Sequence, residues 1–231
     1  METVTVWWAT LGDVLPAHLS LLNGVERARR ARYLREPDRD RFTLGVAITR
    51  LAVGGRMGVE PARLPINRDC PDCGEQHGPP TVVDGPHLSV SHSGDRVVVA
   101  ISPHGPVGVD VEADTGRIGG EISRHLLAPG EAGDHTGQDL LAYWTRKEAL
   151  IKATGDGLRA PMAQIHVSPP GAAPRVLDWE GRPGLAERFA MRTLDPGPGY
   201  AACLAMLDHP ASGPEVEERS AAELLRPANR P

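Results

Sequence analysis

The chain has 231 residues, of which 40% are hydrophobic and 24% are charged, a balance typical of a globular protein with a packed core. Its formal net charge of −5 argues against nucleic-acid binding through bulk charge, because phosphate backbones attract basic surfaces. The 26 glycines and 22 prolines are too many for a helical bundle, and no apolar run is long enough to span a membrane. We therefore expect a mixed α and β protein of the cytoplasm, with its three cysteines reduced.

The first half of the chain is predicted to contain a strand, a helical region, a loop and a set of antiparallel strands. Alternating apolar residues indicate the strands, and a tight turn at Ser93, Gly94 and Asp95 indicates a hairpin. In chain order the patterns predict a strand at 4–11, helices within 14–58, a loop at 61–86 and an antiparallel meander over 88–112.

The second half carries the strongest helix pattern of the chain, at 139–154. Asp139 is expected to cap its start, and Gly155 is expected to end it. Three short alternating segments follow and are expected to be strands, at 164–168, 189–194 and 200–207. From His209 onward the chain is rich in Pro, Ala and Glu, which predicts a loosely attached tail.

Two carboxylates are predicted to project from one face of a short strand. In PVGVDVE, side chains alternate between faces, so Asp110 and Glu112 share a face with Gly108. Like charges at this spacing repel one another unless a cation or a proton intervenes. Mg²⁺ is the simplest such cation, because it binds one or two carboxylates together with phosphates, whereas solvated acids at an exposed strand end are the structural alternative.

The predicted helix at 139–154 carries a stripe of functional side chains. Trp144, Glu148 and Lys152 are spaced four apart and lie on one face, which the tryptophan indicates is turned inward. Lys147 and Lys152 are the only lysines among 25 basic residues, which is either chance or a need for compact ammonium groups. If Glu148 meets the two strand carboxylates, the group has the charges used in phosphoryl transfer. For Lys147, which lies off the stripe, we expect contacts with a partner or a substrate.

Three further features are open to two interpretations each. The segment 27–41 holds seven arginines and is either a solvated helix face or an anion site. His92, between two serines and before a glycine turn, is either structural or a phosphate contact. Cys70 and Cys73, with His77 nearby, indicate a zinc knuckle, but they lack a clear fourth ligand.

The motifs SVSHSG at 89–94, GVDVE at 108–112 and WTRKEALIKATGDGL at 144–158 give the chain a clear resemblance to a known family. It resembles the Sfp-type 4′-phosphopantetheinyl transferases, whose motifs run (N/S)-x-S-H-S, (I/V)-G-(I/V)-D-(I/V)-E and W-x-x-K-E-(A/S)-x-x-K. The resemblance covers about 27–200, and the WTRKEA spelling is similar to the W/KEA branch of the family. Three motifs in the family's order are far more specific than any one of them.

The resemblance implies an α+β fold, a pseudo-twofold monomer of two similar α/β halves with coenzyme A bound in the cleft between them. The halves would span 1–104, with the basic segment, and 105–208, with the metal site, followed by a flexible tail at 209–231. It also implies transfer of the 4′-phosphopantetheine arm of coenzyme A to a serine of an acyl or peptidyl carrier protein of polyketide, nonribosomal peptide or siderophore synthesis. Adenosine 3′,5′-bisphosphate would be released, and no nucleic acid or membrane is expected as a partner.

Matching positions of the motifs imply the roles of individual residues. Asp110, Glu112 and Glu148 would bind Mg²⁺, with Mn²⁺ as the alternative ion. Lys152 would bind phosphate, and Glu148 would be the general base, directly or through water. The residues expected to bind coenzyme A are Arg41 at the 3′-phosphate, Ser91, His92, Asp110 and Lys152 near the phosphates, and Gly78, Pro79 and Pro80 at the adenine.

The chain departs from the family pattern in its loop and its basic segment. Pro79 stands where the family often has a basic residue, so one charge contact is missing there. The arginines at 27–35 stand where relatives often have lysines, and they are not assigned singly. Two rival functions remain at this point: a Mg²⁺-dependent nuclease or phosphohydrolase, and a zinc-binding interaction module built on Cys70 and Cys73.

Overall fold

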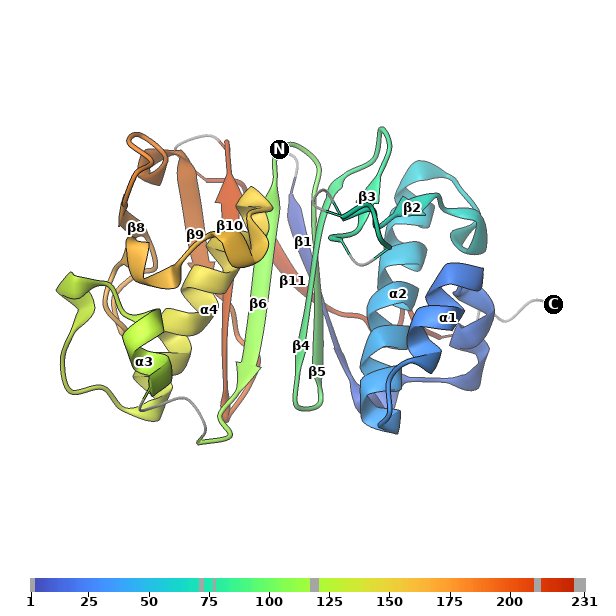
Figure 1. Ribbon diagram of the computed structural model, residues 1–231. Coiled ribbons are helices and arrows are strands. Elements are labelled where there is room, and N and C mark those ends of the chain that lie inside the picture. Colours follow the sequence, from blue (N-terminus) through green and yellow to red (C-terminus); the bar gives the residue numbers. More distant parts are fainter. Residues whose placement is uncertain (1–2, 71–72, 77, 117–120, 210–212, 227–231) are drawn as a thin grey trace. The chain divides into compact units, whose positions relative to one another are not determined.

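A computed structural model describes residues 3–70, 73–76, 78–116, 121–209 and 213–226. The chain forms two compact units, each described here by itself (Figure 1). The first unit comprises 4–103 with 216–226, and the second unit comprises 104–215 with Thr3. Helices and several sheets occur in both units, which confirms the expected α+β class, while the pseudo-twofold relation stays a prediction.

The first unit is a four-stranded sheet with helices, and its strand order is β11-β1-β5-β4. The predicted first strand and the predicted hairpin are both confirmed, as β1 and as the antiparallel pair β4 and β5. Its strands are β1 (Val4–Thr10), β2 (Ile66–Asn67), β3 (Thr81–Val82), β4 (His87–Ser93), β5 (Arg96–Ser102) and β11 (Val216–Ser220). Its helices are α1 (Gly24–Ala31) and α2 (Glu36–Met57), with 3-10 turns at Leu11–Asp13, Pro16–Leu21 and Pro61–Arg63.

The long helix α2 packs directly on the hairpin of the first unit. Leu44 and Ile48 are buried in one hydrophobic cluster with residues of β5. Gly45 brings the helix backbone close to β4, because a Cβ there would lie 3.1 Å from Cγ1 of Val90. This packing fixes the start of α2 beside the end of β4.

The C-terminal segment differs from the predicted flexible tail at 209–231. Residues 216–220 form β11, which pairs in parallel with β1 along the register Val4 with Val216 to Trp8 with Ser220. Trp8 also donates a hydrogen bond of 2.8 Å from Nε1 to Glu218. The segment has no hydrophobic periodicity, and a long-range strand pairing orders it. The prediction of a flexible tail is therefore wrong for residues 216–220. Residues 210–212 and 227–231 lie outside the described residues.

The second unit is built on a three-stranded antiparallel sheet of order β6-β10-β9 and the helix α4. Its strands are β6 (Val107–Ala113), β7 (Ile165–Val167), β8 (Val176–Trp179), β9 (Phe189–Thr193) and β10 (Tyr200–Leu207). Its helices are α3 (Glu121–Leu126) and α4 (Gly137–Thr154), with 3-10 turns at Pro129–Glu131, Gly157–Arg159, Met162–Gln164 and Ala186–Arg188. The three strands predicted after α4 are confirmed as β7, β9 and β10, and β8 is additional.

Strand β6 corrects the predicted meander over 88–112. It is a strand, as expected, but it pairs with β10 and belongs to a different sheet from β4 and β5. Sequence proximity favoured the hairpin neighbour, whereas the actual partner is almost a hundred positions away, with Asp110 opposite Cys203. Strand β6, which carries Asp110 and Glu112, therefore belongs to the same compact unit as the helix at Gly137–Thr154, which carries the WTRKEA motif.

Helix α4 begins two positions before the predicted start. Thr136 is the N-cap, and its side chain accepts from the N–H of Asp139, whose carboxylate accepts from the Thr136 N–H at 2.9 Å. Asp139 therefore completes a capping box at the third helical position instead of capping the helix itself. Gly155 ends the helix in the left-handed region, with φ of 74°, as predicted.

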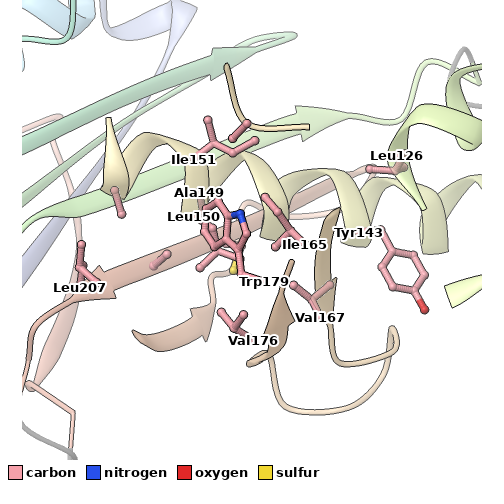
Figure 2. Packing of buried hydrophobic residues seen from close by; sticks show 14 of the residues in the cluster. Leu126, Tyr143, Ala149, Leu150, Ile151, Ile165, Val167, Val176, Trp179 and Leu207 are labelled. Atoms are coloured by element: carbon pink, nitrogen blue, oxygen red, sulfur yellow. The ribbon is translucent and has the colours of Figure 1, made fainter. Parts of the chain in front are cut away.

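The buried side of α4 forms the core of the second unit. Ala149, Leu150 and Ile151 pack with Trp179 of β8 and with residues of β7 and β10, as Figure 2 shows. None of the helices within the described ranges is long and apolar enough to cross a membrane.

Gly108 allows α4 to lie against the backbone of β6. A Cβ at this position would lie only 1.9 Å from the carbonyl oxygen of Ala149 and 2.5 Å from the backbone nitrogen of Ala153. No side chain fits between the strand and the helix here. The absence of a side chain at Gly108 therefore sets the spacing between β6 and α4.

We expect Gly108→Ala to destabilise the protein, because the added methyl group forces α4 away from β6. The free energy of unfolding should fall by roughly 1 to 3 kcal/mol in urea denaturation. Gly55→Ala is the matched control, because a Cβ on Gly55 of α2 meets nothing within 4 Å. That variant should gain up to about 1 kcal/mol from helix propensity. A Gly108→Ala protein as stable as the parent would contradict the close approach.

Candidate active site

The carboxylates of β6 lie on the face that α4 covers. Gly108 on this face touches the α4 backbone, and Asp110 follows it at the two-residue period of a strand. Glu112 is the next residue on the same side and is half-buried. The close approach at Gly108 thus places the face of β6 that carries Asp110 and Glu112 beside α4.

Lys152 of α4 and Asp110 of β6 form an ion pair. The Lys152 Nζ lies 2.7 Å from Oδ1 of Asp110 and donates to the carbonyl oxygen of Val109 at 3.1 Å. Asp110 is 2% exposed, while the lysine side chain keeps 29% of its surface exposed. A buried carboxylate is therefore balanced by an ammonium that solvent and a ligand can still reach.

Glu148 lies one turn before Lys152 and is influenced by both strand carboxylates. Burial raises the pKa of its carboxyl, and the charges of Asp110 and Glu112 raise it further, against the lowering effect of Lys152. Three acidic groups from β6 and α4 therefore repel one another in one place. Trp144, at the start of the same stripe, is half-buried and packs against the core of the second unit.

The donor set fits Mg²⁺, the ion that the sequence resemblance implies. Three carboxylates that repel one another supply the oxygen ligands this ion prefers, and a divalent cation would relieve their repulsion. Among the described residues, no three His, Cys, Asp or Glu side chains are already grouped closely enough to hold a metal. Binding of one ion by all three carboxylates therefore requires their side chains to rotate.

Lys147 corrects the expectation of partner or substrate contacts. Its side chain is fully buried, forms an ion pair with Glu131 and donates to the carbonyl oxygen of Leu126 at 2.6 Å. Glu131 in turn accepts from the N–H of Val167 at 2.8 Å. The lysine holds α4 against three neighbouring segments, and an ammonium buried in this way cannot reach a substrate. The two lysines of the chain therefore have different environments.

In the first unit, Arg41 and His92 lie near the same end of β4. Arg41 forms an ion pair with Asp38 and donates from Nη1 to the carbonyl oxygen of Gly94, in the turn after β4. His92 is exposed and, by strand alternation, shares the face on which Val90 contacts α2. Ser91 points to the opposite face and is buried, so the two residues of the motif do not share one side.

The loop with Gly78, Pro79 and Pro80 is held close to the chain before it. The Gly78 N–H donates to the carbonyl oxygen of Arg68 at 2.7 Å, and a Cβ on Gly78 would lie 2.5 Å from the backbone oxygen of Asp69. Pro79 is exposed and Pro80 is buried. Only glycine therefore fits at the first position of this turn.

Arg68 is a charged residue near this loop that the sequence analysis did not single out. Burial lowers the pKa of its guanidinium to about 10, and repulsion by Arg29 of α1 adds to the effect. Its buried Nε has no hydrogen-bond acceptor in the described part of the chain. Arg29 donates from Nη1 to the carbonyl oxygen of Gln76 and stacks on Phe42. Arginines 29 and 68 therefore form a locally positive site that no motif indicated.

The zinc-knuckle interpretation gains no support from the described residues. Cys70 is buried and Cys73 is exposed. His77 lies outside the described residues, and no metal-binding cluster is present among the residues that are described.

Comparisons with known proteins place these features in one family. Residues 106–205, from β6 to β10, match the family model of the 4′-phosphopantetheinyl transferase superfamily. A putative 4′-phosphopantetheinyl transferase of Synechocystis sp. is 28% identical over 164 residues, which are 66% of this chain and 64% of that protein. The 4′-phosphopantetheinyl transferase HetI of Nostoc sp. is 31% identical over 161 residues, 64% of this chain and 65% of that one.

The match thus spans slightly less than two thirds of these two relatives' own lengths. The 4′-phosphopantetheinyl transferase psf-1 of Bacillus pumilus is 30% identical over 166 residues, which are 67% of this chain and 68% of that protein. The family match covers β6, with its carboxylates, and α4. Together with the coverage of this relative, it shows that the chain belongs to the 4′-phosphopantetheinyl transferase superfamily.

Proposed function

We propose that the protein transfers the 4′-phosphopantetheine arm of coenzyme A to a serine of an acyl or peptidyl carrier protein. Adenosine 3′,5′-bisphosphate is the other product, and the reaction depends on Mg²⁺, with Mn²⁺ as the alternative ion. The observation that carries the proposal is the contact of Lys152 with Asp110 beside Glu148, inside the segment that matches the family. The names of the relatives from Nostoc sp. and Bacillus pumilus support the same reaction.

In this proposal, the residues of the second unit carry the chemistry. The serine oxygen attacks the phosphorus that bears the pantetheine arm, and the bond from this phosphorus to the nucleotide phosphate breaks. Glu148 takes the serine proton, directly or through water, from its place between β6 and Lys152. Lys152 offsets charge on the phosphates, because its side chain is partly exposed next to Asp110.

Asp110, Glu112 and Glu148 are the residues that would hold the metal ion. Mg²⁺ bound there would neutralise the pyrophosphate and polarise the attacked phosphorus. The carboxylates contribute by fixing the ion on the rigid pair of β6 and α4, which the contact at Gly108 holds together.

The first unit supplies the proposed contacts to the nucleotide part of coenzyme A. Arg41 binds the 3′-phosphate, and His92 with Ser91 binds a phosphate. Gly78, Pro79 and Pro80 lie along the adenine. Arg29 and Arg68 join these residues in the proposal, because their mutual repulsion is relieved by a phosphate.

The proposal is tested by mass spectrometry of an apo carrier protein incubated with this protein, coenzyme A and Mg²⁺. We expect a mass increase equal to one phosphopantetheine arm on the carrier serine, and its loss when a chelator is added. Hydrolysis of coenzyme A without modification of the carrier would overturn the proposal in favour of a phosphohydrolase.

We predict that Asp110→Asn and Glu148→Gln each lower the transfer rate by about 100-fold or more, because each removes a metal ligand and one also removes the base. The fold should be retained, since loss of a negative charge reduces repulsion within the carboxylate group. Rates and circular dichroism of purified variants measure both effects. Glu187→Gln, at an exposed carboxylate of the same unit, is the control and should be silent. Parental turnover in Glu148→Gln would exclude the base assignment.

Lys152→Arg is predicted to lose at least about tenfold in transfer rate although the charge is kept, because a planar guanidinium does not replace a compact ammonium beside Asp110. Its stability should change little, because the side chain is partly exposed. Lys147→Arg is the matched comparison: its fully buried site has no room, so the free energy of unfolding should fall by roughly 1 to 3 kcal/mol. Near-parental rates in Lys152→Arg would show that the choice of lysine there is not needed for transfer.

Arg41→Ala is predicted to weaken coenzyme A binding by roughly 1 to 3 kcal/mol while dephospho-coenzyme A binding changes little, because the lost contact is to the 3′-phosphate. His92→Ala should weaken binding by a similar amount. Calorimetric titration of both ligands measures the difference, and Arg56→Ala, exposed at the end of α2, is the control. An Arg41→Ala protein that keeps the parental preference for coenzyme A over dephospho-coenzyme A would show the assignment to be wrong.

A further inference from the structure

The second unit contains a cleft that the transfer reaction does not use. It has a volume of about 390 Å³ and lies between the first half of α4, the loop at 170–172 and the adjoining ends of β9 and β10. Ala142, Thr145 and Arg146 line it from α4. Its size is in the range of pockets that bind small molecules.

Among the described residues, Arg146 is the one lysine or arginine that lines this cleft, and its residue surface is 5% exposed. Its Nη1 donates to the carbonyl oxygens of Ser168 at 2.6 Å and Pro169 at 2.9 Å, and to the Ser168 hydroxyl at 3.2 Å. Its Nη2 donates to the carbonyl oxygen of Ala172 at 2.9 Å. These hydrogen bonds hold the loop at 168–172 against α4.

These hydrogen bonds leave some N–H groups of the guanidinium without an acceptor in the loop. An arginine has five N–H groups, and the loop takes both groups of Nη1 and one of Nη2. Within the described residues, none accepts from Nε of Arg146 or takes the second hydrogen of Nη2. Nε and Nη2 border one edge of the guanidinium plane, and donors along such an edge can bind both oxygens of a carboxylate.

Arg146 also forms no ion pair within the described residues. No carboxylate in the described part of the chain lies within ion-pair distance of it, and burial lowers the pKa of the guanidinium. Cys203, which lines the same cleft, does not compensate, because burial raises the pKa of its thiol to about 12 and keeps it neutral. Glu131 favours the charged guanidinium only through space, and the hydrogen-bond acceptors of Arg146 are all neutral. A buried cation with such partners gains from a ligand that supplies a negative charge in direct contact.

The remaining lining selects the kind of anion. Leu194, Pro196 and Ala142 offer apolar surface next to Arg146. Asp139 also lines the cleft, and hydrogen bonds from Thr136 lower the pKa of its carboxyl, so it is ionised. The Asp139 carboxylate repels a doubly charged phosphate more strongly than an anion with one negative charge.

We propose that this cleft binds a small organic acid, in which a carboxylate accepts two hydrogen bonds from Nε and Nη2 of Arg146 and a compact apolar body packs on Ala142, Leu194 and Pro196. None of the lining residues has a role in the proposed transfer, so the proposal does not rest on the transferase function, although Cys203 lies opposite Asp110 in the register of β10 and β6. The ligand class follows from the N–H groups of Arg146 that have no acceptor within the described residues, from the lack of an ion pair to Arg146 there, and from the apolar lining.

The test is a titration of the isotope-labelled full chain with 3-phenylpropanoate, followed by nuclear magnetic resonance. We expect backbone amides at 171–172, 193–194 and 201–203 to shift, with a Kd of about 1 mM or tighter. The neutral 3-phenylpropanamide should bind at least about tenfold more weakly, because it cannot pair with the guanidinium charge. No shifts at these positions, equal binding of the amide, or displacement of the acid by equimolar inorganic phosphate would each overturn the proposal.

Variants separate ligand binding from the structural role of the hydrogen bonds between Arg146 and the loop at 168–172. Arg146→Lys should abolish binding, but it also removes bonds to the loop. Ala142→Leu therefore fills the cleft while leaving Arg146 in place, and it should abolish binding. Ala142→Ser is the control, because serine is close to alanine in size and leaves the cleft open. Arg175→Ala removes an exposed arginine that does not line the cleft and should bind as the parent does. Unchanged binding in Ala142→Leu would overturn the location of the site.

Discussion

The contact of α4 with the backbone of β6 is the constraint on which the second unit depends. A strand and a helix can meet at this spacing only where no side chain intervenes, and Gly108 provides that position. One strand repeat further on, Asp110 meets Lys152, and Glu148 lies one helical turn before that lysine. The glycine of the GVDVE motif is therefore part of the site's geometry, although it contributes no functional group.

The two lysines of the chain show how one helix can use the same residue type for opposite purposes. Lys147 is buried against Glu131 and carbonyl oxygens, where its charge is fully matched and fixed in place. Lys152 keeps part of its surface exposed beside Asp110, where its charge is available to a ligand. They lie five positions apart, which on a helix is more than a full turn, so they point in different directions.

Local patterns predicted the site better than they predicted the sheets. Strand alternation placed Asp110 with Glu112, and helical spacing placed Glu148 with Lys152, because both depend on neighbours only a few residues away. The partner of β6, the pairing of β11 with β1 and the role of Lys147 depend on segments far along the chain. Arg68 was missed for the same reason: its meaning comes from Arg29, which no sequence spacing relates to it.

Consecutive charged residues of the WTRKEA segment anchor α4 on three sides. Because each helical residue is rotated by about 100° from the last, Arg146 reaches the loop at 168–172, Lys147 reaches Glu131, and Glu148 turns toward β6. A helix rotation of about 20° would move an atom ~6 Å from the axis by about 2 Å, enough to misplace a catalytic group. Two charged anchors on the other faces oppose such a rotation. The residues beside Glu148 thus set the orientation of α4, on which the proposed role of Glu148 depends.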